Sequence, residues 1–392
     1  MPSKDQQIPS PRPREEAAPT FETWRARLEA ACARAEDANK DLQAQISGFL
    51  EVLKALGTPM IDGPAAHFVY YDPAARTVAV AGEFTQWAAN PRLMDPIGES
   101  GFFYYSHQFA KPARIEYKLV VDGNWIADPF CPNRIDNGVG GENSWFVIGE
   151  FEEPPELKRL PDVPQGRIEE FDFQSRLLNN TRRVYVYLPP AYSEQPQLRF
   201  DTLYVHDGGE YMTRANLPVV LDNLAHAGLI PRLIAVMVDP VNRNQEYRAS
   251  EDYARFTAEE LLPEIDRRYR TNKSRQARGV MGASLGGLIS TYLALSRPEL
   301  FSKVGGQSSA LMIATATITS LIAELKAPGL FYFDVGEYEP RFIPAHETII
   351  PMLQRQGCRC KFQVVPAGHN WTSWRGHLKD LLTFLWPDSG QT

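Results

Sequence analysis

The chain has 392 residues, of which 43% are hydrophobic and 23% are charged, and its formal net charge at pH 7 is −7. This is the composition of an ordinary soluble globular protein, and the length favours more than one domain. The acidic balance, the lack of a long basic run and the lack of about 18 consecutive apolar residues argue against nucleic acid and against a membrane as partners.

The first 57 residues divide into a polar tail and a helical extension. Residues 1–20 are rich in Pro, Arg, Glu and Ser, and we expect them to be disordered. Residues 21–57 carry apolar side chains at helical spacing, which predicts a helix pair that Gly57 ends. Two roles are open for this extension. It packs on the neighbouring domain, or it is an oligomerisation or regulatory helix pair. With the oligomerisation role, the protein would be a homo-oligomer.

Residues 62–150 change to short β-like runs separated by turn residues. The runs lie at 67–71, 77–81, 102–109, 115–121 and 144–148. About 85 residues of this kind suit a small, immunoglobulin-like β-sandwich. Residues 151–166 are rich in proline and acidic residues and are expected to be a linker.

Residues 167–388 alternate strand patterns with helix patterns. Strands are predicted at 183–188, 202–206, 233–238, 279–282, 329–335 and 361–365. Helices are predicted between them, including 251–269, 285–296, 343–355 and 371–385. This alternation predicts an α/β domain with a mainly parallel sheet and helices on both faces.

The pattern Gly-x-Ser-x-Gly occurs at residues 282–286, between an apolar run and a helix-like run. In this context it indicates a strand that turns sharply into a helix, with Ser284 at the turn. Gly282 and Gly286 leave room for a serine held in a strained backbone conformation. The hydroxyl of Ser284 would then stand above the sheet at the positive end of the following helix, where it can act as a nucleophile.

Two loops that follow later strands supply a base and an acid for this serine. His369 follows the last predicted strand, and Glu339 follows the strand before it. The order serine, acid, histidine is that of α/β-hydrolases. A histidine takes the serine proton and returns it to the leaving alcohol, while a carboxylate fixes the imidazole tautomer. We expect Glu339 to be the acid, with Glu337 as the runner-up, and Asp334, inside the strand, to be structural.

An oxyanion hole needs two backbone donors beside the serine. We expect one to be the amide of Leu285 and the other the amide of Gly209, in a glycine pair that follows an earlier strand. His206, in the same region, is a rival base, but it precedes the serine and is expected to support the oxyanion loop. Structural roles are expected for the remaining histidines: His67, His107, His226, His346 and His377.

Residues 167–386 resemble a family of α/β-hydrolase esterases that includes enterochelin esterases, feruloyl and acetyl-xylan esterases, esterase D and mycolyltransferases. The resemblance is carried by 184–190 (VYVYLPP), 206–209 (HDGG), Arg243 with 246–247, 259–263 (EELLP), 282–287 (GASLGG), 336–340 (GEYEP) and 368–371 (GHNW). It implies a Ser-His-acid esterase without a metal or other cofactor. The GEYEP stretch is most similar to the enterochelin-esterase branch. Residues 305–310 lack the tryptophans expected of a catecholate-siderophore pocket.

The β domain resembles the E-set, or glycogen-binding, module of the AMP-activated kinase β subunit and of branching enzymes. The resemblance rests on 82–87 (GEFTQW), 116–125 (EYKLVVDGNW), 128–129 and 143–144. It implies a sugar site, because indole rings stack on a pyranose and polar side chains bind its hydroxyls. The matching positions are Trp87, Lys118, Trp125 and Asn143. In the alternative, the module only shapes a wall of the active site.

We therefore expect a serine carboxylic-ester hydrolase that acts on a small-molecule or glycan-linked ester. Three hypotheses follow: an enterochelin-esterase-like enzyme for a siderophore or related ester, a feruloyl or acetyl-xylan type carbohydrate esterase that a polysaccharide-binding module guides, and a non-catalytic glycan-binding protein. Residues 1–19 lack the apolar core of a secretory signal, and the four cysteines form no C-x-x-C pair. Both features favour the cytoplasm, whereas a leader already removed would mean secretion.

Overall fold

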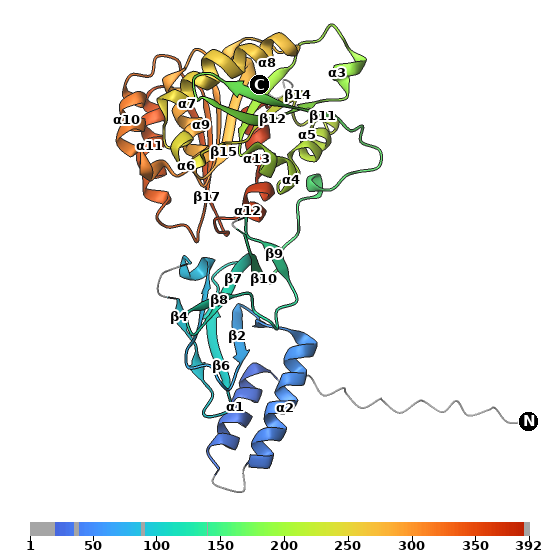
Figure 1. The fold of residues 1–392 in the computed structure, drawn as a ribbon, viewed down its shortest axis with the longest axis vertical. Helices are drawn as coiled ribbons and strands as arrows, with labels where there is room; N and C mark the ends of the chain where they lie inside the picture. The colour runs from blue at the N-terminus through green and yellow to red at the C-terminus, as the bar shows by residue number, and fades with distance from the viewer. Residues whose placement is uncertain (1–19, 35–38, 88–90, 139, 388–392) are drawn as a thin grey trace, which may run out of the picture.

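A computed structural model describes residues 20–34, 39–87, 91–138 and 140–387, and it forms two lobes (Figure 1). One lobe holds two N-terminal helices and two antiparallel sheets, and the other holds the α/β domain. The tail predicted to be disordered, 1–20, lies outside the described residues except for Thr20. In the described part of the chain, no helix is long and apolar enough to cross a membrane.

The N-terminal extension forms two helices that lie side by side, α1 (Phe21–Cys32) and α2 (Asn39–Leu56). The side chain of Thr20 caps α1 by accepting a hydrogen bond from the backbone N–H of Thr23 at 3.3 Å. The apolar faces of both helices are buried against the first sheet, in a cluster of Phe21, Trp24, Leu28, Ile46, Phe49, Leu53, Val69, Ile97 and Phe102. The extension therefore packs on the neighbouring domain, as one of its two expected roles requires.

Two antiparallel sheets make up the β module, which is 62–150 in the sequence prediction. The first has the order β1-β2-β6-β5, with β1 (Met60–Asp62), β2 (Ala65–Tyr71), β6 (Phe102–Gln108) and β5 (Asp95–Pro96). The second has the order β4-β3-β7-β10-β9, with β4 (Arg92–Leu93), β3 (Val78–Gly82), β7 (Ala113–Val121), β10 (Glu142–Ile148) and β9 (Arg134–Asp136), while β8 (Asn124–Ile126) pairs with β7. Aromatic side chains such as Phe68, Tyr117 and Phe146 fill the core of the module.

The α/β domain is built on one eight-stranded sheet of order β11-β12-β14-β13-β15-β16-β17-β18. Its strands are β11 (Arg167–Ser175), β12 (Asn180–Leu188), β13 (Asp201–His206), β14 (Leu233–Val238), β15 (Arg278–Ala283), β16 (Lys303–Gln307), β17 (Leu330–Gly336) and β18 (Arg359–Val365). The pairs of β12 with β11 and β14 are antiparallel, and all other pairs are parallel. Parallel strands end at one edge, which brings loops far apart in sequence together.

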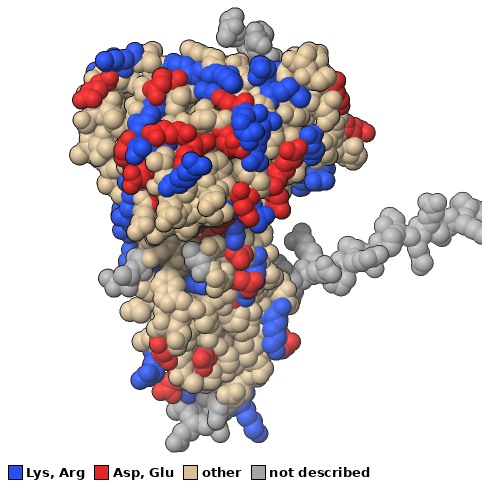
Figure 2. Space-filling model, turned by 45° about the horizontal axis from the view of Figure 1, so that its top comes forward, with Lys and Arg blue, Asp and Glu red and all other residues tan. Residues whose placement is uncertain are grey.

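Helices cover both faces of this sheet, as predicted. One face is covered by α7 (Glu251–Arg255), α8 (Leu262–Arg268), α9 (Leu285–Ser296), α10 (Thr315–Ala323) and α11 (Ile343–Arg355). The other is covered by α4 (Gly208–Thr213), α5 (Leu217–His226), α12 (Trp371–Gly376) and α13 (Leu378–Leu385). Short helices α3 (Ala191–Glu194) and α6 (Arg243–Glu246) complete the domain. Lys, Arg, Asp and Glu side chains intermingle on the face of this lobe that Figure 2 shows.

In the β module, the sequence pattern misses the short strands β1, β4, β5, β8 and β9, and in the α/β domain it misses β11, β16 and one helix break. β11 is largely exposed and polar, and β16 contains two glycines, so neither has the β-branched composition of a strand. Pairing with their neighbours forms both strands in spite of their composition. The helix predicted at 371–385 is broken at His377 into α12 and α13.

Three polar contacts, among others, join the β module to the α/β lobe. Lys111 pairs with Glu337 at 2.7 Å, and Asp136 pairs with Arg214 at 2.7 Å. The third runs from Glu83 at the end of β3 to Asn370, directly after His369. The β module therefore faces the loops at the carboxyl ends of the parallel strands (Figure 1).

Candidate active site

Ser284 occupies a sharp turn between β15 and α9, as the motif predicts. Its backbone has φ 58° and ψ −120°, a conformation that costs a non-glycine residue about 1–3 kcal/mol. The turn is held because the amide of Ser284 donates to the carbonyl of Gln307 on β16 at 2.8 Å. A Cβ at Gly282 would lie 2.6 Å from the backbone carbon of Gly286, so the turn requires glycine there.

His369 and Glu339 come together from two loops. His369 follows β18, Glu339 follows β17, and Nδ1 of the imidazole is hydrogen-bonded to Oε1 of the carboxylate. The second oxygen, Oε2, accepts hydrogen bonds from the hydroxyl of Ser308 and the amide of Gly336, both at 2.7 Å. Because Nδ1 is engaged, Nε2 is the ring nitrogen left to exchange a proton with a nucleophile.

Aromatic side chains hold the imidazole of His369 from two sides. The ring of Trp374 meets it edge-on, with ring centres 5.0 Å apart, and Phe342 lies tilted against it at 5.0 Å. The indole N–H of Trp374 donates to the hydroxyl of Ser308 at 3.0 Å. The hydrogen bonds from Trp374 through Ser308 to Glu339 thus fix both the acid and the imidazole.

The other acidic candidates point elsewhere. Glu337, the runner-up, accepts a hydrogen bond from Nζ of Lys111 in the β module at 2.7 Å. Asp334 is buried in β17 and accepts a hydrogen bond from the side-chain Nε2 of Gln307 at 3.2 Å, and burial raises its pKa to about 6. Of these three carboxylates, Glu339 is the one in contact with His369.

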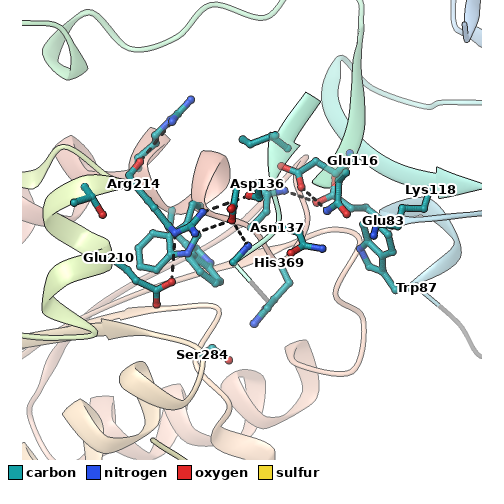
Figure 3. A pocket seen from close by; sticks show the side chains of 18 of the residues that line it. Glu83, Trp87, Glu116, Lys118, Asp136, Asn137, Glu210, Arg214, Ser284 and His369 are labelled. Carbon is teal, nitrogen blue, oxygen red and sulfur yellow. Dashed lines mark hydrogen bonds and ion pairs between the residues drawn. The ribbon is translucent and has the colours of Figure 1, made fainter. Parts of the chain in front are cut away.

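Ser284 and His369 line the same cavity, which has a volume of about 730 Å³ and lies between the two lobes (Figure 3). They also line a second, more apolar cavity of about 390 Å³, whose wall includes Met312, Ile313 and Phe342. Among the residues that the structure describes, no hydrogen bond joins Ser284 to His369. Such bonds often form only when substrate is bound.

All four residues expected to bind sugar line the cavity that Ser284 lines. They are Trp87, Lys118, Trp125 and Asn143. The ring of Trp125 is 45% exposed, whereas Asn143 is buried and its side-chain amide donates to Glu116 at 2.9 Å. The face of the β module that was expected to bind sugar therefore forms part of the wall of the cavity that contains Ser284.

The two expected oxyanion donors differ in their surroundings. The amide of Leu285 lies in the first turn of α9, where backbone N–H groups have no partner within the helix. The amide of Gly209, in contrast, donates to the carboxylate of Asp239 at 2.7 Å. The predicted role for Gly209 therefore requires this hydrogen bond to break.

His206, the rival base, is buried beneath the serine turn. Its Nδ1 is hydrogen-bonded to the hydroxyl of Ser290 on α9 at 2.8 Å, and burial lowers its pKa to about 3. A ring in this position is neutral at ordinary pH and is part of the core. The contact with Ser290 places His206 under the helix that follows Ser284, whereas its expected support of the oxyanion loop stays a prediction.

Arg243 is a residue of the site to which sequence reasoning assigned no role. Its guanidinium binds both oxygens of Asp207 at 2.8 Å and also donates to the carbonyl of Ala283 at 3.3 Å. It lines the larger cavity and fixes the strand end that carries Ser284. Within the described ranges, no group of three or more His, Cys, Asp or Glu side chains could hold a metal ion.

Comparisons with known proteins agree with this geometry. The model of the family described as "Putative esterase" matches residues 175–385. The chain belongs to this esterase family. It is a carboxylic ester hydrolase, which sets aside the hypothesis of a non-catalytic glycan-binding protein.

The proteins similar to this chain include enterobactin esterases and a feruloyl esterase. The Iron(III) enterobactin esterase of Escherichia coli O6:H1 is 26% identical over 281 residues, which are 67% of each chain. An endo-1,4-beta-xylanase/feruloyl esterase of Xylanibacter ruminicola is 26% identical over 210 residues, 48% of this chain and 27% of that protein. The structure of the enterobactin esterase FES from Shigella flexneri aligns with a TM-score of 0.68 and 21% identity, covering 82% of this chain and 92% of that one. This last likeness is one of fold, and it agrees with the α/β-hydrolase architecture described above.

Proposed function

We propose that Ser284, His369 and Glu339 act as a catalytic triad. Nε2 of His369 takes the proton of the Ser284 hydroxyl as its oxygen attacks the ester carbonyl. The resulting imidazolium is stabilised by Glu339 and returns the proton to the leaving alcohol, which leaves an acyl-enzyme. Water, activated by the same imidazole, then releases the acid and restores Ser284. The contact between His369 and Glu339 supports these roles.

Negative charge on the carbonyl oxygen during the attack needs backbone donors. We propose the amide of Leu285 as the first, because it follows the nucleophile at the start of α9. The positive end of the helix adds to this stabilisation. The amide of Gly209 would be the second, after it exchanges Asp239 for the oxyanion.

For the substrate, we propose a siderophore-type ester of the kind that the names of the enterobactin esterases indicate. The observation that carries this proposal is the shared cavity, which the β module closes over Ser284. Its volume of about 730 Å³ is large enough for a bulky ester. Tryptophans at its wall suit aromatic groups, and the basic side chain of Lys118 suits an anionic one.

A carbohydrate ester is the second candidate, and the same wall of the cavity supports it. Trp87 and Trp125 can stack on sugar rings, and Lys118 can bind hydroxyl groups. The relative named as a feruloyl esterase is consistent with this candidate. Binding of the sugar by the β module would then bring the ester to Ser284 directly.

A panel of esters distinguishes the two candidates. Initial rates would be measured with enterobactin, a feruloylated xylo-oligosaccharide, acetylated xylan and p-nitrophenyl acetate, using Ser284→Ala as the blank. A siderophore esterase should show a kcat/KM for enterobactin at least about a hundredfold above that for the sugar esters. The reverse ranking would establish the carbohydrate candidate and overturn the first.

A further inference from the structure

The loop that carries His369 is in contact with one buried glutamate of the β module. Glu83 directly follows β3 and is 2% exposed. Its Oε1 accepts a hydrogen bond from Nδ2 of Asn370, which lies 287 positions later in the sequence. Its Oε2 accepts from the backbone N–H of Glu116 at 3.0 Å. Figure 3 shows Glu83, Glu116 and His369 along one wall of the cavity.

The same carboxylate packs against the residue that precedes His369. A Cβ at Gly368 would overlap Oε1 of Glu83, so only glycine allows this close approach. Glu83 therefore contacts both sequence neighbours of His369, Gly368 and Asn370. A displacement of Glu83 would free the backbone on both sides of the histidine.

Asn370 connects Glu83 to the helix that holds the imidazole. Its side-chain oxygen caps α12 by accepting from the backbone N–H of Ser373 at 2.8 Å. The helix carries Trp374, whose ring packs edge-on against His369. The side-chain oxygen of Asn370 is thus hydrogen-bonded to the backbone of α12, and its side-chain nitrogen is hydrogen-bonded to Glu83.

Packing alone does not account for a glutamate at this position. A buried carboxylate is costly unless it is paired with a cation, and the described residues give Glu83 no ion pair. Arg114 pairs with Glu116 instead, at 2.9 Å. Burial, followed by the negative charge of Glu116, raises the pKa of Glu83 to about 8. The groups that face Glu83 are Glu116 and Arg114 of β7, Tyr338 after β17, and Asn370 beside His369.

We propose that Glu83 is a positioning residue for His369, through which the β module holds the loop of the base in its working position. The inference rests on the proposed roles of Ser284 and His369. An ionised Glu83 accepts a stronger hydrogen bond from Asn370, and its charge favours the imidazolium that forms during the attack. Turnover should therefore increase as Glu83 loses its proton.

The test follows kcat and KM for p-nitrophenyl acetate between about pH 6 and about pH 9.5 in the full chain. Glu83→Gln keeps the shape of the side chain but cannot ionise. Near pH 6.5 its kcat should be within about twofold of wild type, and near pH 9 it should be at least about fivefold lower, with little change in KM. In wild type, kcat should rise near pH 8 as Glu83 loses its proton. This rise, the upper step of the pH profile, should be absent in Glu83→Gln.

A second variant tests the route through Asn370. Asn370→Ser keeps an N-cap oxygen for α12 but is too short to reach Glu83. It should lose the same upper step, and the double variant with Glu83→Gln should be no slower than the slower single variant, because the two residues act as one unit. Losses that multiply in the double variant would overturn the proposal.

Lys111→Met serves as the matched control, because it removes the Lys111–Glu337 contact between the lobes without touching the His369 loop. Its pH profile should match that of wild type. A profile like that of Glu83→Gln would overturn the proposal, because loss of any contact between the lobes would then have the same effect.

Parallel profiles for wild type and Glu83→Gln would also overturn it. If Glu83→Gln does not fold in a thermal melt, Asn370→Ser decides alone. An active Ser284→Ala would instead refute the proposed function.

Discussion

Glu339 binds Nδ1 of His369 although 30 residues separate them in the sequence. Two strands of the parallel sheet, β17 and β18, lie side by side, and each carries one of these residues just past its carboxyl end. The carboxylate is 5% exposed and is also held by Ser308 and Gly336. The carboxylate of Glu339 is therefore already fixed against His369 in the structure.

Replacement of the nucleophile should abolish turnover. Ser284→Ala removes the attacking oxygen and is expected to lower kcat for p-nitrophenyl acetate by at least about a thousandfold. Ser296→Ala, at the far end of α9, is the control and should retain wild-type kcat. The assay is the release of p-nitrophenol at saturating ester, and full activity of Ser284→Ala would contradict the assignment.

The choice between the two glutamates can be tested with isosteric amides. Glu339→Gln should lower kcat by roughly a thousandfold or more, because a neutral amide neither fixes the tautomer of His369 nor stabilises its imidazolium. Glu337→Gln should remain within about threefold of wild type, because Glu337 forms an exposed ion pair with Lys111. A larger loss in Glu337→Gln than in Glu339→Gln would show that Glu337 is the acid.

The buried imidazole of His206 should make the protein less stable in acid. Burial lowers the pKa of His206 to about 3, below its usual value of about 6.5. The unfolded chain therefore binds the proton first, so the stability is complete above about pH 6.5 and is lost as the pH falls toward about 3. Between about pH 6.5 and about pH 5, we expect His206 to account for roughly 2 kcal/mol of the decrease in the free energy of unfolding.

Urea titrations at the two pH values measure this decrease. His206→Asn keeps a polar atom near Ser290 but does not titrate, so its decrease should be smaller than that of wild type by this amount. The exposed His226, replaced by Asn, is the control and should leave the decrease unchanged. An equal pH dependence in wild type and His206→Asn would contradict the prediction.

The tryptophans of the β module should affect bulky substrates only. Trp125→Ala is expected to lower kcat/KM for the best bulky ester by roughly tenfold, which is the loss of one aromatic stacking contact. Turnover of p-nitrophenyl acetate should stay within about twofold of wild type, because a small ester does not extend to Trp125. Phe151→Ala, which removes an exposed aromatic ring outside this cavity, is the control. Equal losses for both esters would indicate a structural role for Trp125.

Local sequence signals were sufficient where the structure is determined by nearby residues. The serine turn needs glycine at Gly282, two residues before Ser284, and the motif with its flanking strand and helix contains that information. The order of Ser284, Glu339 and His369 indicated the fold, because each residue follows a predicted strand. Strands β11 and β16 could not be predicted in this way, because their pairing partners and not their composition make them strands.

Contacts between distant segments had no local signal. The GEFTQW stretch suggested a sugar site through Trp87, whereas the buried contact of Glu83 with Asn370 depends on how the two lobes meet. The hydrogen bond from the backbone N–H of Gly209 to Asp239 likewise depends on where the fold places the loop after β14. Neither partner is near the other in the sequence.

The proposed chemistry of this protein could be inferred from local patterns alone: a serine at a glycine-flanked turn, followed by an acid and a histidine after later strands. The fold was needed to show that Glu339 and not Glu337 contacts His369, and that the tryptophans of the β module line the cavity of the serine. Backbone conformation is set by neighbouring residues, whereas side-chain contacts across a sheet edge or between lobes depend on packing of the whole chain.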